Sequence, residues 1–503
     1  MRRDISDCLK PQPGVPWRRP LDEQDVAVRL ETEGITDRVA QADWGYSGTW
    51  DIAREVYRRL TATEEQTAGV EPTPEWKEHA KGMSFALPLA LSCLAMLILH
   101  FSLWGGPLSS EAAAAVAMGT VSSFVLTGGI VQAMARQGLF YAGTGELRMS
   151  QVACERWYRY GAAVLVGSAG LAALINGAFE WLPSPLVWTA LGFHLTLGFF
   201  WLGTGVLYML DRNLLVAVSA TLGIAVAALL HLALRLPLIP SQLIAIVTAA
   251  GFATWRASQL LRERAATDPG RVHRRMAIRT MYLTAPYLVY GCLYYLFLFA
   301  DRLMAWTAQT QSASLPLVFR GDYELPLDVA LFAFVVQVGW VHSSMHRFYQ
   351  HLKTLQLACE IDRVGQFNRA MQRFYAARVL MFLPFAMLVS LAVGAISWKL
   401  GFLSGDLSGR VAALALSGYP LLVIGLWNVS LLFALSLPKS VLPAIVAGTV
   451  LNAASGYLLS RTLSYEWAAA GFAIGCLAFA FTSSLTVYRR FADLDYYFFA
   501  SAA

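Results

Sequence analysis

The sequence predicts an all-α membrane protein with about twelve transmembrane helices. The first observation is composition: 56% of the 503 residues are hydrophobic and only 14% are charged. An average soluble protein has about a quarter charged residues. The second is the succession of apolar segments after Met83, each near the length of about twenty residues that crosses a bilayer. A membrane β-barrel would instead show short segments of alternating polarity.

Each predicted span is an apolar segment bounded by polar or basic residues. The approximate limits are 83–104, 110–135, 158–181, 184–210, 213–234, 238–260, 280–305, 326–347, 374–398, 408–435, 439–460 and 465–488. The longest basic linker, 263–279, follows the sixth span and separates an N-terminal lobe, 83–262, from a C-terminal lobe, 280–490. Two halves of six spans are typical of transporters built from repeats. A tail, 491–503, ends the chain.

Basic residues predict the orientation. They concentrate in the loops after the second, fourth, sixth, eighth, tenth and twelfth spans, so the positive-inside rule places both termini in the cytoplasm. The net charge of +6 therefore needs no nucleic-acid partner. Thr307–Leu325 is the one sizeable outer loop, and Gln350–Gln372 is predicted to form a polar cytoplasmic helix. The N-terminus has no apolar region typical of a cleavable signal peptide.

Residues 1–82 form a polar cytoplasmic segment that we interpret as an adaptor. Its first twenty residues, rich in Pro and Arg, are expected to be disordered. Ile52, Val56 and Leu60 repeat at helical spacing. Three aromatic residues are available to pack a small helical unit or to dock it on a partner: Trp44, Tyr46 and Trp50. A linker, Glu64–Pro74, follows.

The stretch Tyr290–Trp306, YGCLYYLFLFADRLMAW, contains the strongest candidate site. A charged pair within or at the end of a span usually faces protein or water. One helical face joins the tyrosines to the carboxylate: Tyr287, Tyr290, Tyr294, Leu298 and Asp301. We predict that this face and Arg302 belong to a substrate pathway or gate. The alternative is that the tyrosines pack the protein interior while Asp301 and Arg302 form an interfacial ion pair.

Further polar residues lie inside spans. His342 and His346 are four residues apart, but no third ligand or HExxH motif accompanies them, so we predict no metal site. Individually, such residues usually form hydrogen bonds between helices. Together they predict a hydrated cavity: Gln132, Asn176, His194, His231, Gln337, Asn428 and Asn452. We include Gln337, His342 and Asn428 in the predicted substrate pathway.

Other functional classes lack their signatures. The sequence contains no GxxxxGK[ST] phosphate-binding loop and no repeated channel filter. Its six cysteines show no metal-binding spacing. The protein is therefore expected to be neither an enzyme nor a channel, and no cofactor is predicted.

Two adjacent segments resemble a known family. YYLFLFADRLMAW and YELPLDVALFAFVVQVGWVHSSMHRFYQHLK are similar to the seventh and eighth spans of PelG-like exopolysaccharide exporters. This family belongs to the multidrug/oligosaccharidyl-lipid/polysaccharide (MOP) flippase superfamily. The shared pattern is an aromatic run, an acidic–basic pair, a Trp and a Tyr-x-Leu-Pro start, within about residues 290–350. The polar segment 1–82 departs from that family, as does the first span, MSFALPLALS.

The resemblance implies a fold and a function. The fold would be two six-helix lobes around a central cavity, with the first two spans facing the seventh and eighth. The function would be export of an exopolysaccharide or glycan intermediate across a bacterial inner membrane during biofilm formation. Alternating access would be coupled to an ion gradient or to polymer synthesis. Implied partners are a cytoplasmic glycosyltransferase, other export subunits and membrane lipid. Alternatives are a flippase for lipid-linked oligosaccharides and a non-transporting scaffold that recruits a glycosyltransferase.

Overall fold

The computed structural model describes residues 23–32, 34–67, 74–268, 277–308, 317–358, 364–403 and 405–497. Within these residues the regular secondary structure is entirely helical. The chain divides into two compact units, Met1–Pro74 and Glu75–Ala503. The boundary lies eight residues before the predicted end of the adaptor at 82, because helix α4 (Glu75–Met83) packs with the second unit.

The small unit contains α1 (Glu23–Thr32), α2 (Asp37–Val39) and α3 (Thr49–Thr67). Trp44 is buried in its core, whereas 48% of the Trp50 surface remains exposed. The core side chains repeat at helical spacing: Val26, Leu30, Ile52 and Val56. Asp37 Oδ1 accepts a hydrogen bond from the Thr49 N–H at 2.7 Å, and this bond lowers the pKa of the Asp37 carboxyl. The predicted disorder of the first twenty residues lies outside the described residues.

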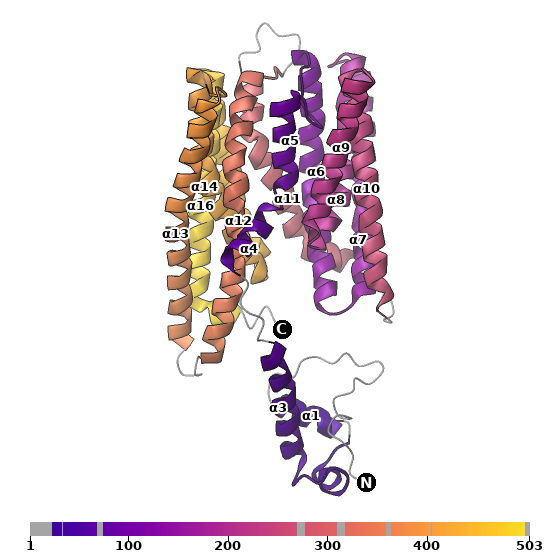
Figure 1. Ribbon diagram of the computed structural model, residues 1–503, viewed down its shortest axis with the longest axis vertical. Coiled ribbons are helices and arrows are strands. Elements are labelled where there is room, and N and C mark those ends of the chain that lie inside the picture. Colours follow the sequence, from indigo (N-terminus) through magenta and orange to yellow (C-terminus); the bar gives the residue numbers. More distant parts are fainter. Residues whose placement is uncertain are drawn as a thin grey trace. The chain divides into compact units, whose positions relative to one another are not determined.

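The described part of the large unit contains twelve further α-helices (Figure 1). They are α5 (Leu87–Leu99), α6 (Ser110–Gly143), α7 (Leu147–Phe179), α8 (Ser184–Met209), α9 (Asn213–Ala228), α10 (Leu238–Ala266), α11 (Ala277–Trp306), α12 (Gly321–Ala358), α13 (Val364–Lys399), α14 (Asp406–Ala434), α15 (Leu442–Thr462) and α16 (Ala468–Arg490). Among the described residues, eleven helices are long and apolar enough to cross a membrane. If α4 and α5, which are bent by 60° relative to each other, are counted together as one span, the number of spans in the described residues is twelve. These helices confirm the predicted class of a multi-pass membrane protein.

Three segments differ from their predicted form. The first span is not one helix over 83–104, because the chain bends between α4 and α5. The polar segment Gln350–Gln372 supplies the ends of α12 and α13 on either side of residues 359–363, which lie outside the described part. The predicted tail is packed at its start, where Phe491 and Leu494 are fully buried. The linker and the outer loop are described only in part, without residues 269–276 and 309–316.

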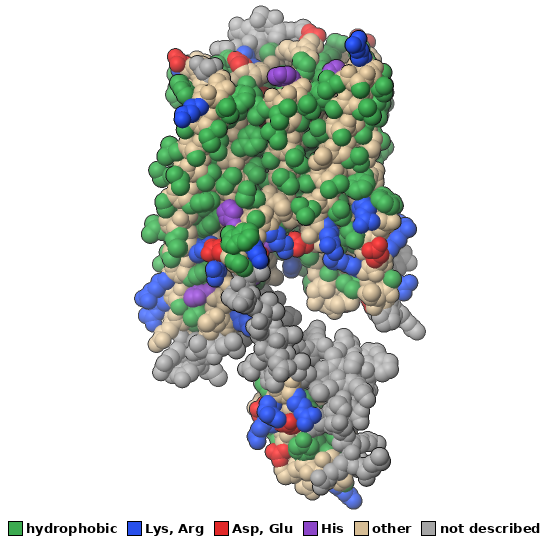
Figure 2. Space-filling model, in the orientation of Figure 1, with side chains coloured by type: hydrophobic (Ala, Val, Ile, Leu, Met, Phe, Trp, Pro, Cys, Tyr) green, Lys and Arg blue, Asp and Glu red, His purple; other side chains and the backbone are tan. Residues whose placement is uncertain are grey.

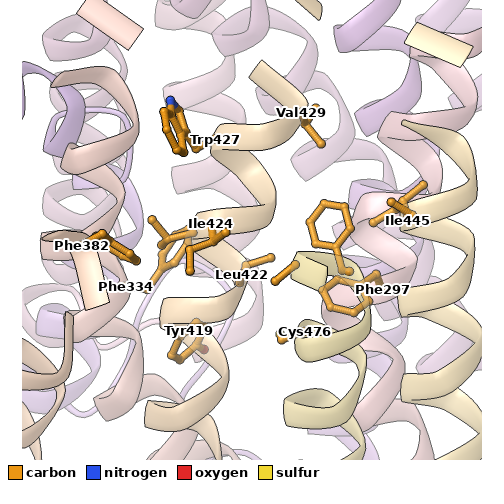
Figure 3. Close-up of a cluster of buried hydrophobic side chains, with 14 of the residues drawn as sticks. Phe297, Phe334, Phe382, Tyr419, Leu422, Ile424, Trp427, Val429, Ile445 and Cys476 are labelled. Carbon is orange, nitrogen blue, oxygen red and sulfur yellow. The ribbon is translucent and has the colours of Figure 1, made fainter. Parts of the chain in front are cut away.

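Two lobes make up the large unit, α5–α10 and α11–α16. Rings from α11, α12, α13 and α14 gather in the core of the second lobe (Figure 3). Trp340 lies 4.3 Å from Phe382 and 4.8 Å from Trp427, measured between ring centroids. Where helices approach more closely, glycines replace side chains: a Cβ on Gly471 would lie 2.6 Å from the Gly456 Cα. Small residues let membrane helices pack at backbone contact.

The lobes meet where α6 crosses α11. A Cβ on Gly291 would lie 2.4 Å from the Gly128 carbonyl oxygen, and one on Gly129 would lie 2.4 Å from the Leu288 oxygen. The two backbones are therefore in contact, with no room for any side chain. We call this contact the glycine crossing (Gly128, Gly129 and Gly291).

Figure 2 shows hydrophobic side chains over the middle of the large unit and charged side chains toward its ends. The end at which α6, α8 and α10 finish is rich in arginine, and we call it the basic end: Arg136, Arg148, Arg156, Arg262 and Arg264. Arg264 Nη2 reaches the Leu210 carbonyl oxygen there, and the Arg148 N–H donates to Asp268. The positive-inside rule assigns the basic end to the cytoplasm, and that orientation stays a prediction.

Candidate functional site

A cavity of about 550 Å³ lies between the two lobes. Helices α5, α6 and α8 line it from the N-terminal lobe, and α11, α12 and α14 from the C-terminal lobe. This arrangement agrees with the expectation that the first two spans face the seventh and eighth. A site shared by two lobes changes shape when the lobes move relative to each other.

Aromatic rings from both lobes form one wall, with Phe124 at its centre. The Phe124 ring centroid lies 4.4 Å from Trp201, 5.0 Å from Tyr295 and 5.6 Å from Phe299. Trp104 adds a further ring 6.1 Å from Trp201. The Trp201 Nε1 atom is buried without a hydrogen-bond acceptor in the described structure. The wall therefore offers stacking surfaces to a ligand, while its one unused donor is covered by protein in this conformation.

Beside these rings, α11 and α12 contribute a network of charged residues, and the Arg302 guanidinium carbon lies 5.6 Å from the Phe299 ring centroid. Arg302 Nε donates to Glu324 Oε2 at 2.8 Å, and Trp306 Nε1 donates to Glu324 Oε1 at 2.9 Å. Tyr323 Oη donates to Asp301 Oδ2 at 2.8 Å. Adjacent Asp301 and Arg302 thus bond to different partners on α12. The interfacial ion pair between Asp301 and Arg302, considered as an alternative, does not form.

Two carboxylates near this network form no ion pair within the described structure. Asp301 is only 1% exposed, and its Oδ1 atom has no hydrogen-bond donor within the described structure. Asp328 also lines the cavity, and among the described residues no basic nitrogen lies within 4.0 Å of either carboxylate. A buried carboxylate is costly unless it is protonated or paired. The site can therefore take up a proton or another cation. The described residues contain no cluster of three potential metal ligands.

The bend between α4 and α5, which we call the elbow (residues 75–89), contributes lining residues to the cavity. Phe85 stacks on Tyr208 with ring centroids 5.5 Å apart, and both residues line the cavity. Tyr208 Oη also donates to the Phe85 carbonyl oxygen at 2.9 Å. Nearby, Asn213 Nδ2 donates to Ser84 Oγ at 3.0 Å. These bonds join the elbow to α8 and α9 of the N-terminal lobe.

The same elbow is bonded to the C-terminal lobe through α4. Glu75 pairs with Arg378 at 2.7 Å, and Glu78 lies 3.1 Å from His342 Nε2. A Cβ on Gly82 would lie 2.7 Å from the Gly339 carbonyl oxygen, so α4 and α12 also touch through their backbones. The elbow is therefore a bridge between the lobes at the basic end.

Three of the predicted pathway residues line the cavity: Tyr294, Asp301 and Arg302. Two of the predicted tyrosines do not: Tyr290 lies in the core of the C-terminal lobe, and Tyr287 lies under Arg136 of α6, whose guanidinium carbon is 5.4 Å from the Tyr287 ring centroid. Tyr287 and Tyr290 pack on Phe433, with ring centroids 4.7 Å and 5.3 Å away. The predicted polar track along α11 is therefore interrupted.

The other predicted pathway residues hold helices together. Gln337 Nε2 donates to the Ala386 carbonyl oxygen and to Ser390 Oγ, which joins α12 to α13. Asn428 Oδ1 accepts from the Tyr375 hydroxyl at 2.8 Å. His342 contacts Glu78 outside the cavity. These placements match the usual role of single polar residues in membrane helices.

Sequence reasoning missed Glu324, the partner of Arg302, and the elbow. Glu324 and Asp328 are four residues apart, so they share a face of α12, and both precede a long apolar run. That spacing was a usable signal. The contact between Arg302 of α11 and Glu324 of α12 could not be predicted from the sequence. Residues far apart along the chain pair in this way only when the two helices have a particular relative rotation, which sequence periodicity does not give.

Comparisons with known proteins show which solved structures have a similar fold. No family model and no curated protein sequence matches the chain. A mutant form of the MATE transporter VcmN from Vibrio cholerae is similar with a TM-score of 0.60 at 14% identity, over 84% of this chain and 99% of that one. A MOP superfamily transporter from Pyrococcus furiosus is similar with a TM-score of 0.58 at 13% identity, over 84% and 97%. The chain therefore has the fold of MOP superfamily transporters.

One further pair of solved structures represents two conformations of a multidrug resistance MATE family transporter. The outward-facing form matches with a TM-score of 0.58 at 13% identity, over 84% of this chain and 96% of that one. The inward-facing form matches with a TM-score of 0.53 at 13% identity, over 82% and 95%. The fold of this chain is thus similar to both conformations of that transporter.

Proposed function

We propose that this protein is a membrane transporter that exports an exopolysaccharide, or a glycan intermediate of its synthesis, by alternating access. The observation that carries the proposal is the cavity between the lobes, whose lining combines a cluster of aromatic rings with buried carboxylates. The basic end faces the cytoplasm in this proposal, and the elbow is the cytoplasmic gate. The transporter fold, which covers 84% of the chain, supports the same reading.

A glycan fits the chemistry of this lining. The apolar faces of sugar rings stack on aromatic side chains such as Phe124 and Trp201. Sugar hydroxyls provide acceptors for the free Trp201 Nε1 donor and donors for the Asp301 carboxylate. A volume of about 550 Å³ lies within the range typical of small-ligand sites. A polymer would therefore occupy the cavity one short segment at a time.

Asp301 and Asp328 supply the coupling to an ion gradient in this proposal. A proton or cation that neutralises them removes an unpaired buried charge and so favours the state in which it is bound. A ligand shifts a conformational equilibrium only through its different affinity for the two states. The Tyr323 hydroxyl donates to the Asp301 carboxylate, so neutralisation of Asp301 would weaken this hydrogen bond between α11 and α12.

The small cytoplasmic unit binds a glycosyltransferase in this proposal. Its exposed apolar side chains, Trp50 and Val28, support a docking role, since 58% of Val28 and 48% of Trp50 are accessible. Aromatic residues are enriched at the centre of protein interfaces. Trp50→Ala should reduce recovery of the enzyme without changing the amount of transporter in the membrane.

Polymer secretion from a deletion strain that carries the gene for each variant tests the transport proposal. Phe124→Ala removes the centre of the aromatic wall and should lower export by about tenfold, or about 1.4 kcal/mol. Glycan should accumulate inside the cells, and its attachment to a lipid would identify a lipid-linked substrate. Phe481→Ala is the matched control, because Phe481 is 67% exposed on the outside of α16. Equal export by both variants at equal protein levels would contradict transport through the cavity and favour a scaffold.

A further inference from the structure

A second hollow lies on the N-terminal lobe, away from the cavity between the lobes. It is a groove of about 780 Å³ formed by α7, α8 and α10, and it shares no lining residue with that cavity. Its lining residues are Tyr158, Leu195, Thr196, Phe199, Val247, Ala250, Gly251, Thr254, Trp255, Ser258, Gln259 and Arg262. All three helices are long and apolar enough to cross a membrane, and the groove residues Val247 and Trp255 are exposed, so we expect the groove to face lipid.

The groove changes from apolar to polar along its length. Leu195, Phe199 and Val247 line the half at the middle of α8 and α10. Ser258, Gln259 and Arg262 follow on α10 toward the basic end. A ligand that matches this gradient has a hydrocarbon part in the bilayer and a polar part at the membrane–water interface.

The apolar half is open down to the helix backbone. A Cβ at Gly251 would meet no other atom within 4 Å. Val247 and Trp255 on either side along α10 are 55% and 53% exposed. Across the groove, Tyr158 Oη and Thr254 Oγ1 lie 3.4 Å apart and connect α7 with α10. The helices α7, α8 and α10 thus form the base of the groove, and the space above Gly251 is open to the outside. An acyl chain would fit into this open space.

The polar half offers hydrogen-bond donors to an anion. Arg256 Nη1 donates to Gln259 Oε1 at 2.5 Å, and this bond leaves the Gln259 amide N–H₂ as a donor. Arg262 is exposed, and among the described residues no carboxylate lies within 4.0 Å of it. An exposed guanidinium beside amide and hydroxyl groups is suited to a phosphate. Basic residues at the membrane interface attract anionic lipids by about 1 kcal/mol each.

We propose that this groove binds one anionic phospholipid. Its acyl chain lies along Leu195, Phe199 and Gly251, and its phosphate contacts Arg262 and Gln259. This site is independent of the cavity and of the proposed transport function, because neither its residues nor its ligand chemistry is shared with them.

Native mass spectrometry of the purified full-length protein tests the proposal, with phosphatidylglycerol and phosphatidylcholine of identical acyl chains as probes. The unmodified protein should bind phosphatidylglycerol about tenfold more tightly than phosphatidylcholine. Arg262→Gln should abolish that preference while phosphatidylcholine still binds. Gly251→Leu should weaken both lipids about tenfold, because the leucine fills the open space without meeting another atom.

Matched controls separate the groove from general effects. Gly170→Leu on α7 also places a leucine in open space, since a Cβ there meets nothing within 4 Å. Arg369→Gln removes an exposed charge from α13 in the other lobe. Both should bind phosphatidylglycerol as the unmodified protein does, and Gly251→Leu should retain its thermal unfolding temperature. Equal affinity for the two lipids, or unchanged binding by Gly251→Leu, would overturn the proposal. So would displacement of the bound lipid by inorganic phosphate alone, which would indicate an anion site without an acyl chain.

Discussion

The two lobes face the same cavity with different chemistry. Within the described residues, every charged side chain of the cavity lining comes from the C-terminal lobe: Asp301, Arg302, Glu324 and Asp328. The N-terminal lobe contributes aromatic, small and neutral polar groups, with Phe124 and Trp201 at the centre. The charged groups of the described lining are thus confined to one lobe, whereas aromatic rings line the cavity from both. The C-terminal wall is suited to ion-dependent steps, and the N-terminal wall to contact with the cargo.

The largest expected effect tests whether the C-terminal wall depends on its internal pairing. Arg302→Ala should destabilise the protein by about 3–5 kcal/mol, because it leaves the mostly buried Glu324 carboxylate without its partner. The Arg302 side chain is only 15% exposed and is bonded to Glu324, so its charged head does not extend to the membrane interface. Thermal unfolding in detergent measures the effect. The double variant Arg302→Met with Glu324→Gln should recover most of the stability. A single variant as stable as the double would contradict the pairing.

The next effect tests whether ion coupling belongs to the C-terminal lobe. Asp301→Asn keeps the shape of the side chain and an oxygen for the Tyr323 hydroxyl, but it removes the charge. Export should fall by roughly a hundredfold, or about 2.7 kcal/mol, at normal protein levels. Asp322→Asn is the control, because Asp322 lies nearby on α12 but is exposed and does not line the cavity. Export by Asp301→Asn at the unmodified rate would assign Asp301 a purely structural role.

A smaller loss of stability is expected when an ion pair that attaches the elbow to one of the lobes is removed. Glu75 pairs with Arg378, whose side chain is only 12% exposed, whereas the Lys81–Asp211 pair toward the other lobe is about half exposed. Removing the Glu75 charge with Glu75→Gln should cost about 1–3 kcal/mol of stability, because the Arg378 guanidinium loses a charged partner. Lys81→Ala should cost less than about 1 kcal/mol. Thermal unfolding with both variants measures the difference. Equal losses would mean that the elbow is held equally by both lobes.

The smallest effect concerns the N-terminal wall. Trp201→Phe keeps a stacking ring and removes the free Nε1 donor. If the donor bonds to the cargo, the apparent affinity should fall by about 0.5–1.5 kcal/mol while maximal export is unchanged. Export at a series of cytoplasmic glycan concentrations separates the two quantities. A loss of maximal export comparable to that of Asp301→Asn would contradict the division between the walls.

The sequence was sufficient for the fold and for part of the site. Apolar length and basic loops predict the spans, because the bilayer imposes both features on the chain. A charge is costly in hydrocarbon, and this rule correctly indicates that Asp301 and Arg302 face the protein interior. The same rule says nothing about Tyr287 or Asn428, because tyrosine and asparagine fit a packed lobe interior as well as a cavity. The elbow was also unpredictable, because α4 and the bend after it are held by contacts with α8, α9 and α12 that are distant in sequence.

The glycine crossing constrains how the lobes move. With the backbones of α6 and α11 already in contact at Gly128 and Gly291, the two helices have no space to approach, and a slide would carry side chains into the contact. The motion that remains possible is a rotation of α6 relative to α11 about their point of contact. At 1.5 Å per residue, Ala117 lies about 16 Å from this pivot and Arg136 about 12 Å on the other side. A rotation of about 15°, as in subunit motions of other proteins, displaces these positions by about 4 Å and 3 Å in opposite directions. The same rotation would therefore open the cavity at one end and close it at the other.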